Sequence, residues 1–302
     1  MDDLETRQLR YFVTVAEELH FGRAAERLGM AQPPLSRAIR ELERQLGVPL
    51  LERTTRQVKL TAAGQVLLRE ARTALDAIAA AGRRARNAGR PSPRLRVALK
   101  ADNDAGLLPR ILDAYRGEQA ALEVELVLGG WGQQAQALRD GRADVALLVS
   151  PFDDRGLDVE PLLTEPRLIA LAAADPLAAR PCLRLADLAG RKLPDGSPAD
   201  HDGSAGAVTH GGRPAADLAQ ILRLIELGSI ICYLPASVAR RYERPEIAYR
   251  PVSDLGPATL AVAWPQVSRS PAVAAFVRAA AATASTASAP AKGSGQDLFR
   301  VL

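Results

Sequence analysis

Apolar residues recur at three- and four-residue spacings along the first 46 positions, a pattern that predicts amphipathic helices. We expect three helices, separated at Gly22 and at Gly29. Pro33 and Pro34 suit the first turn of the third helix, where the missing N–H groups would have no partner within the helix. The inward-facing positions are Leu9, Phe12, Val13, Ala16 and Leu19 in the first helix, Ala24, Ala25 and Leu28 in the second, and Leu35, Ile39, Leu42 and Leu46 in the third.

The third helix carries a polar outer face. Gln32, Ser36 and Arg40 are spaced four residues apart, and Pro33 and Arg37 lie beside them. Two helices joined by a tight connection form a helix-turn-helix, whose second helix can enter the major groove of DNA. Gln can bond adenine and Arg can bond guanine at two atoms each, Ser can bond a base or a phosphate, and Pro can contact a thymine methyl. The pattern indicates base reading; the alternative is a three-helix bundle whose polar face is merely solvated.

Residues 50–60, LLERTTRQVKL, alternate apolar and polar positions around a basic turn, which fits a small two-stranded wing. Arg53, Thr54, Thr55 and Arg56 lie in this wing and suit contact with DNA phosphates. Residues 1–96 contain 18 Lys and Arg against 11 Asp and Glu, a net charge of +7, while the rest contains 21 against 24, a net charge of −3. The positive charge of residues 1–96 favours a polyanionic partner.

Residues 61–88 contain no proline and predict one long helix with Thr61 as its N-cap. Apolar and small residues recur there at alternating spacings of three and four, which is typical of a coiled-coil seam. We expect this helix to join two copies of the chain; the alternative is a helix lying on its own domain. The seam residues are Leu68, Ala71, Leu75 and Ile78, followed by Gly82 and Ala85. A Gly-, Pro- and Ser-containing linker, RNAGRPSPR, follows at 86–94.

Beyond the linker, the strand–helix–strand–helix–strand order of residues 95–149 predicts a parallel α/β sheet, and further strands follow. The expected strands are 95–101, 122–130, 143–149, 167–173, 229–235, 247–252 and 258–264, and a final helix is expected at 271–282. Residues 194–214 are rich in Gly and Asp and predict a mobile loop. Residues 284–302 predict a disordered tail.

Length and composition limit the number of domains and the class of protein. The chain has 302 residues, enough for two domains, and at 47% hydrophobic and 25% charged its composition is ordinary for a soluble protein. It contains no run of about 20 apolar residues that could span a membrane. The start, MDDLETRQLR, has no signal-peptide pattern, so we expect a cytoplasmic protein. Cys182 and Cys232 form neither a metal-ligand spacing nor a disulfide framework, and no metal or cofactor is expected.

The run from Leu9 to Leu68, LRYFVTVAEELHFGRAAERLGMAQPPLSRAIRELERQLGVPLLERTTRQVKLTAAGQVLL, closely resembles the N-terminal domain of the LysR-type transcriptional regulators. The segments GLLPRIL, ALRDGRADVALL and LIELGSIICYLPASVA resemble the effector domain of the same family. Leu51 stands where many members have Phe. The resemblance implies a winged helix-turn-helix at 1–60, a dimerising linker helix and hinge at 61–93, and a two-lobed α/β effector domain at 94–283 built like a type 2 periplasmic binding protein.

The resemblance further implies lobe 1 at about 94–164 and 261–283, and lobe 2 at about 165–260. The family's base-reading positions fall on Gln32, Pro33, Ser36 and Arg37, and its phosphate-contacting wing arginine falls on Arg53. Members bind double-stranded DNA as tetramers on neighbouring pseudo-palindromic sites and change its bend when an effector binds. RNA polymerase is a further candidate partner, and no membrane is expected to be one.

An effector would bind at the carboxyl ends of the strands, between the lobes. Family members that bind aromatic or dicarboxylic acids often place Ser or Thr in the first loop, whereas this chain has Asp102, Asn103 and Asp104. Two carboxylates would repel an acid, so we expect a neutral or cationic effector; the alternative is that both Asp side chains cap a helix. The candidate contacts are Lys100, Asp102, Asn103, Asp104, Trp131, Gln133, Ser150, Thr209 and His210.

One rival function remains. Gly130, Gly132 and Ala135 in GGWGQQA match the dinucleotide fingerprint G-x-G-x-x-A, with Asp153 and Asp154 about 20 residues on. This motif favours a nicotinamide-dependent oxidoreductase as the alternative. Trp131 would crowd the tight turn, and no acid–base pair follows, so we expect a regulator rather than an enzyme. A third alternative, an exported solute-binding protein, would require a signal peptide.

Overall fold

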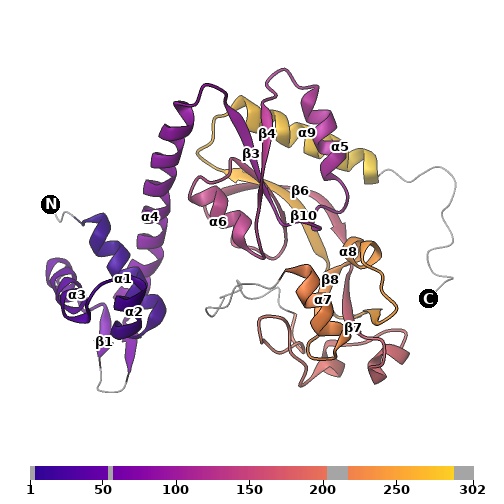
Figure 1. The fold of residues 1–302 in the computed structure, drawn as a ribbon, viewed down its shortest axis with the longest axis horizontal. Helices are drawn as coiled ribbons and strands as arrows, with labels where there is room; N and C mark the ends of the chain where they lie inside the picture. Colours follow the sequence, from indigo (N-terminus) through magenta and orange to yellow (C-terminus); the bar gives the residue numbers. More distant parts are fainter. Residues whose placement is uncertain (1–3, 54–56, 203–216, 289–302) are drawn as a thin grey trace. The chain divides into compact units, whose positions relative to one another are not determined.

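The computed structural model describes residues 4–53, 57–202 and 217–288. The chain divides near Gly89 into two compact units. The N-terminal unit contains the helices α1 (Thr6–Glu18), α2 (Phe21–Arg27) and α3 (Gln32–Leu46), the strands β1 (Leu51–Arg53) and β2 (Val58–Leu60), and the long helix α4 (Ala62–Ala88) (Figure 1). All three predicted short helices, the wing and the long helix are therefore confirmed.

The first three helices close on one apolar core. Phe12, Val15, Leu35, Ile39 and Leu42 have no exposed surface. Local chemistry sets the ends of the helices: the ring of His20 accepts a hydrogen bond from the N–H of Arg23, and α3 stops where Gly47 adopts a φ of +69°. The prediction that Leu19 faces inward is wrong. Helix α1 ends at Glu18, so the side chain of Leu19 is 45% exposed, and Val15 occupies the core position instead.

The long helix α4 packs at its start against the wing and α1. Thr61 caps it by accepting a hydrogen bond from the N–H of Gly64 at 3.0 Å. Only glycine fits at position 64, since a Cβ there would lie 2.1 Å from the carbonyl oxygen of Leu50. Leu68 packs against the N-terminal core and Ala71 is 1% exposed in the single chain. Ala71 therefore packs within its own chain, as the alternative of a helix lying on its own domain expects, and the intermolecular seam of α4 stays a prediction.

The first lobe of the second unit is a mixed five-stranded sheet in the order β4-β3-β5-β10-β6. Its strands are β3 (Arg94–Leu99), β4 (Glu123–Leu128), β5 (Val145–Val149), β6 (Leu157–Glu165) and β10 (Ala258–Pro265). The strands β4, β3 and β5 are parallel as predicted, while β10 runs antiparallel to both β5 and β6. Helices α5 (Leu108–Arg116) and α9 (Pro271–Ser288) cover one face, and α6 (Gln133–Arg139) covers the other (Figure 1).

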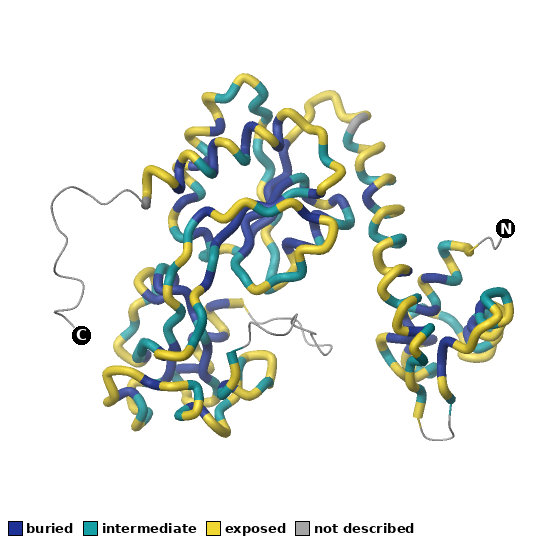
Figure 2. The backbone as a smooth tube through the Cα atoms, turned by 180° about the vertical axis from the view of Figure 1, so that it is seen from behind, coloured by how far each residue is buried: buried dark blue, intermediate teal, exposed yellow. Residues whose placement is uncertain are grey.

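The second lobe is a three-stranded antiparallel sheet in the order β8-β7-β9, built from β7 (Arg167–Ala172), β8 (Cys232–Pro235) and β9 (Ile247–Pro251). These three strands correspond to the strands predicted at 167–173, 229–235 and 247–252. Helices α7 (Leu218–Glu226) and α8 (Ala236–Arg241) complete it, with short 3-10 turns at Pro176–Ala179 and Leu185–Leu188. Dark blue buried segments follow the strands of both lobes (Figure 2).

One additional strand and two boundaries differ from the expected ones. Strand β6 was not predicted, because Pro161 and a register shift opposite Leu260 and Ala261 interrupt its alternation of apolar and polar residues. Strand β10 begins at Ala258, three residues before the expected return to the first lobe. Helix α9 continues to Ser288 because Ala284 is buried on the sheet, so the predicted tail does not begin at 284. Within the described ranges, no helix combines the length and hydropathy needed to cross a bilayer.

Candidate DNA-binding surface and effector site

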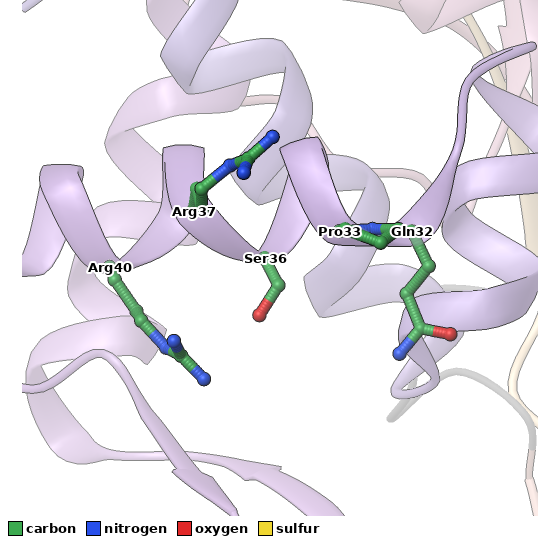
Figure 3. Close-up of a pocket in the computed structure, with 5 residues that line it drawn as sticks. All are labelled: Gln32, Pro33, Ser36, Arg37 and Arg40. Carbon is green, nitrogen blue, oxygen red and sulfur yellow. The ribbon is translucent and has the colours of Figure 1, made fainter.

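The polar face of α3 surrounds a hollow of about 460 Å³ on the outside of the N-terminal unit. Its lining consists of Gln32, Pro33, Ser36, Arg37 and Arg40 (Figure 3). Ser36 and Arg40 point to the same side of the helix, with Gln32 at its start. The opposite stripe of α3, Leu35, Ile39 and Leu42, is fully buried, so core packing fixes the direction of this face. The helix therefore presents amide, hydroxyl and guanidinium groups together, the donor and acceptor set that reads base edges.

The wing arginine has partners within the protein. One Nη of Arg53 donates to a carboxylate oxygen of Glu43 at 2.8 Å, and its guanidinium lies 4.9 Å from the centre of the Phe21 ring. Thr54 and Arg56 fall outside the described residues. Sequence reasoning missed Glu43, although an acidic residue beside the buried stripe of α3 was a signal that it needs an internal partner.

In the second unit, three of the predicted effector loops meet at one edge of the sheet. Strands β3, β4 and β5 are parallel, so the loops Lys100–Asp104, Gly130–Gln133 and Ser150–Pro151 all follow carboxyl ends at that edge. Thr209 and His210 fall outside the described residues. In the first loop, Asp102 and Ala105 have φ values of +73° and +50°. Residues other than Gly are strained in this left-handed backbone conformation, and residues strained in this way cluster at ligand and active sites.

The acidic residues of the first loop contact the second lobe. The carboxylate of Asp104 accepts hydrogen bonds from the N–H of Gly106, in the turn before α5, and from the N–H of Leu108, the first residue of α5. The N-cap of this helix is Leu107, so Asp104 supports the turn that leads into the helix. The Asp104 carboxylate also accepts from Arg241 at 3.2 Å. Asp102 does not cap the helix but accepts a hydrogen bond from the hydroxyl of Tyr242. That hydrogen bond raises the pKa of Tyr242, because it holds the phenol proton against a carboxylate.

A second contact joins the lobes near their connections. The carboxylate of Glu165, at the end of β6, accepts from the N–H and from the hydroxyl of Ser237 in α8, each at 2.6 Å. Helix α8 is thus tied to the first lobe at its start by Glu165 and at its end by Asp104. Sequence reasoning missed Glu165, Ser237, Arg241 and Tyr242, since nothing in the local pattern shows that they lie opposite the first loop.

Lys100 and Trp131 form the remaining part of the candidate effector site. The ammonium of Lys100 lies 4.9 Å from the centre of the Trp131 ring, a cation–π contact. Burial lowers the pKa of Lys100, partly offset by the nearby carboxylate of Asp102. Trp131 also packs against the apolar core of the second lobe. Its ring therefore lies where both lobes meet.

Two other candidate contacts are used internally. The side-chain oxygen of Gln133 accepts from the N–H of Gly130 at 3.0 Å. The hydroxyl of Ser150 accepts from the N–H of Thr259 at 2.9 Å. Asn103 is half-buried in the first loop. Gln133 and Ser150 therefore shape their loops, and a ligand would compete with these bonds.

The GGWGQQA turn does not have the setting of a dinucleotide site. The fingerprint belongs after the strand at the topological switch point of a doubly wound sheet, whereas β4 lies at the edge of this one. Gln133 and Gln134 bond the turn's own backbone at Gly130. Asp153, proposed for a ribose, pairs with Arg155 at 2.7 Å. Across residues 4–53, 57–202 and 217–288, no three His, Cys, Asp or Glu side chains gather as metal ligands would.

Comparison with known proteins agrees with this geometry. Residues 6–65 match the model of the bacterial regulatory helix-turn-helix proteins of the lysR family, and residues 88–285 match the LysR substrate binding domain. The Hca operon transcriptional activator HcaR of Escherichia coli (strain K12) is 32% identical over 91% of this chain and 96% of its own length. The regulator AlsR of Bacillus subtilis (strain 168) is 38% identical over 61% of this chain, a match that spans 62% of AlsR.

A solved structure shows the same architecture. The crystal structure of CbnR, a LysR family transcriptional regulator, is 27% identical, with a TM-score of 0.52 over 93% of this chain and 99% of that one. The matched models, the winged helix-turn-helix and the two-lobed domain leave the oxidoreductase alternative without support. This chain belongs to the LysR family of DNA-binding transcriptional regulators.

Proposed function

We propose that α3 reads the operator sequence through Gln32, Pro33, Ser36, Arg37 and Arg40. The observation that supports this assignment most strongly is the exposure of this polar face on the side of α3 opposite its fully buried stripe of Leu35, Ile39 and Leu42. Arg53, Thr54 and Arg56 of the wing would contact phosphates and set the register of the protein on the duplex.

Substitution of Arg37 tests the assignment. Arg37→Ala should weaken binding by about 1–3 kcal/mol at the preferred sequence and relax the preference at one or two base pairs. Arg44 is the matched control, because it lies on the same helix but pairs with Glu41 and does not line the hollow. Selection of sites from a random duplex pool measures both variants. An unchanged sequence preference for Arg37→Ala would remove α3 as the reading element.

We further propose that the protein acts as a homotetramer made of two dimers on neighbouring pseudo-palindromic half-sites. Leu75 is half-buried and Ile78 is 50% exposed on α4, so an apolar surface remains for a second copy beyond the part that packs on α1. Effector binding would change the arrangement of the lobes and the bend of the DNA, with RNA polymerase as a partner downstream. Bacterial DNA lies in the cytoplasm, where this function would be carried out.

We also propose that a small effector binds between the lobes, at Lys100, Asp102 and Trp131. The site brings a flat aromatic wall beside one ammonium and one carboxylate. Asp104 is compensated by Arg241, so the four charged groups here sum to zero. A neutral ligand with hydroxyl groups, or one with an amine facing Asp102, fits this balance better than a simple acid.

A further inference from the structure

One carboxylate on the reading helix connects it to the wing. Oε1 of Glu43 accepts hydrogen bonds from the N–H groups of Leu50 and Leu51, at 3.0 and 3.1 Å. Its Oε2 accepts from Arg53 at 2.8 Å. The Glu43 side chain is only 17% exposed. Its three donors lie in β1 or, in the case of Leu50, directly before it.

The hydrogen bonds from Leu50 and Leu51 to Glu43 lie on the edge of β1 that does not pair with β2. Strand β1 pairs with β2 along one edge only, and the segment before it would otherwise leave buried N–H groups without acceptors. Leu50 and Leu51 are both buried, at 1% and 5% exposure, so water is not a ready substitute. The carboxylate of Glu43 therefore fixes where the strand starts relative to α3.

The same carboxylate orients Arg53. The guanidinium is bound to Glu43 of α3 on one side and lies over the ring of Phe21, the first residue of α2, on another. A planar guanidinium held by two elements keeps its remaining N–H groups in a fixed direction. Both helices of the helix-turn-helix thereby determine where the wing cation points.

We propose that Glu43 is a positioning residue for DNA recognition, which holds the wing and Arg53 at a fixed orientation to the reading face of α3. The proposal rests on the proposed role of α3 and the wing. Because Glu43 is negatively charged, the direction of the change in DNA affinity on its neutralisation tests the proposal. Taking a carboxylate away from a DNA-binding unit should strengthen binding through simple electrostatics, because DNA is a polyanion. If Glu43 positions the wing, its neutralisation must weaken binding instead.

The decisive variant is Glu43→Gln in the full-length protein, which keeps an acceptor for the backbone but loses the ion pair. Glu41→Gln is the matched control on the same helix, since Glu41 is exposed and forms an ion pair with Arg44, three residues further along the same helix. The probe is duplex DNA that the wild-type protein selects from a random-sequence pool. We expect a roughly tenfold loss of affinity for Glu43→Gln, the size of one charge-assisted hydrogen bond, and unchanged or tighter binding for Glu41→Gln.

Salt dependence separates positioning from a loss of folded protein. Without its orienting partner, Arg53 should lose its phosphate contact, and the slope of log affinity against log salt should fall by about one. A smaller folded fraction would lower the affinity without changing the slope. In the Arg53→Gln variant, which has already lost the cation, adding Glu43→Gln should change neither the affinity for DNA nor its salt dependence by much.

Binding by Glu43→Gln that matches or exceeds the wild type, with an unchanged slope, would overturn the proposal. If Glu43→Gln does not fold, Glu43→Asp takes its place: it keeps the charge but shortens the reach, and wild-type affinity and slope would again overturn the idea. Arg37→Ala, measured on the same probe, distinguishes the two proposals. If Arg37→Ala loses sequence preference while Glu43→Gln behaves like Glu41→Gln, only the positioning role fails; if Arg37→Ala changes nothing, the reading face itself is wrong.

Discussion

A guanidinium nitrogen of Arg241, at the end of α8, lies 3.2 Å from a carboxylate oxygen of Asp104 in the first loop of the other lobe. The two residues are 137 positions apart in the chain, so the contact exists only in the folded domain. Asp104 is 7% exposed and also accepts from the backbone N–H groups of Gly106, just before α5, and of Leu108, its first residue. One side chain thus supports a helix start and joins the two lobes.

Removal of the Asp104 charge should destabilise the effector domain. Asp104→Asn loses the ion pair and weakens the two backbone bonds, so the free energy of unfolding should fall by about 1–3 kcal/mol. Asp113→Asn is the control, because Asp113 pairs with Arg116 on an exposed helix face and such pairs contribute about 0–1 kcal/mol. Chemical denaturation followed by circular dichroism measures both variants. Equal stabilities would contradict this role for Asp104.

The oligomer should depend on the outer apolar positions of α4. Ile78 is 50% exposed in the single chain, and burying the exposed half against a second copy is worth about 1 kcal/mol. Ile78→Glu should therefore reduce the dimer and abolish binding to two half-sites. Thr73→Glu adds the same charge at an exposed polar position of the same helix and should leave the oligomer intact. Sedimentation velocity decides: an unchanged oligomer for Ile78→Glu would place the interface elsewhere.

The effector proposal predicts a ligand preference that Asp102 controls. In a thermal-shift panel, neutral polyols and amines should stabilise the wild-type protein more than simple carboxylates do. Asp102→Ser removes a carboxylate beside Lys100 and leaves the site with an uncompensated cation, so the preference should move toward acids. Asp113→Ser serves as the control, since it removes an equal charge from an exposed helix. Tight binding of a simple carboxylate by the wild type would rule the idea out.

The two cysteines should differ in reactivity. Burial raises the pKa of the Cys232 thiol to about 12, whereas Cys182 is exposed. The thiolate is the reactive form, so at pH 8 an alkylating reagent should modify Cys182 first and reach Cys232 only on unfolding. The unfolded thiol ionises near pH 9, so stability contributed by the neutral thiol is present below that pH and is lost between about pH 9 and 12. Mass spectrometry that finds Cys232 modified in the folded protein would refute this.

Much of the N-terminal unit could be predicted from local sequence. The spacing of Phe12, Leu35 and Ile39, with Pro33 at a helix start and Thr61 as a cap, determines the helices through forces that act within a few residues. The polar face of α3 followed from the same periodicity, because a buried stripe fixes the direction of everything opposite to it. The parallel strands β3, β4 and β5 were also predicted, since alternating strands and helices leave few other topologies.

Only the tertiary structure decided the contacts between residues that are distant in the chain. The antiparallel return of β10 next to β5, the burial of Ala71, and the pairing of Asp104 with Arg241 depend on which surfaces meet after the elements have formed. Glu43 of α3 was missed for this reason, because the spacing of residues along one helix does not show that Arg53 and two backbone N–H groups reach its carboxylate. Periodicity specifies the face on which a side chain lies, whereas its partner is set by the packing of the whole domain.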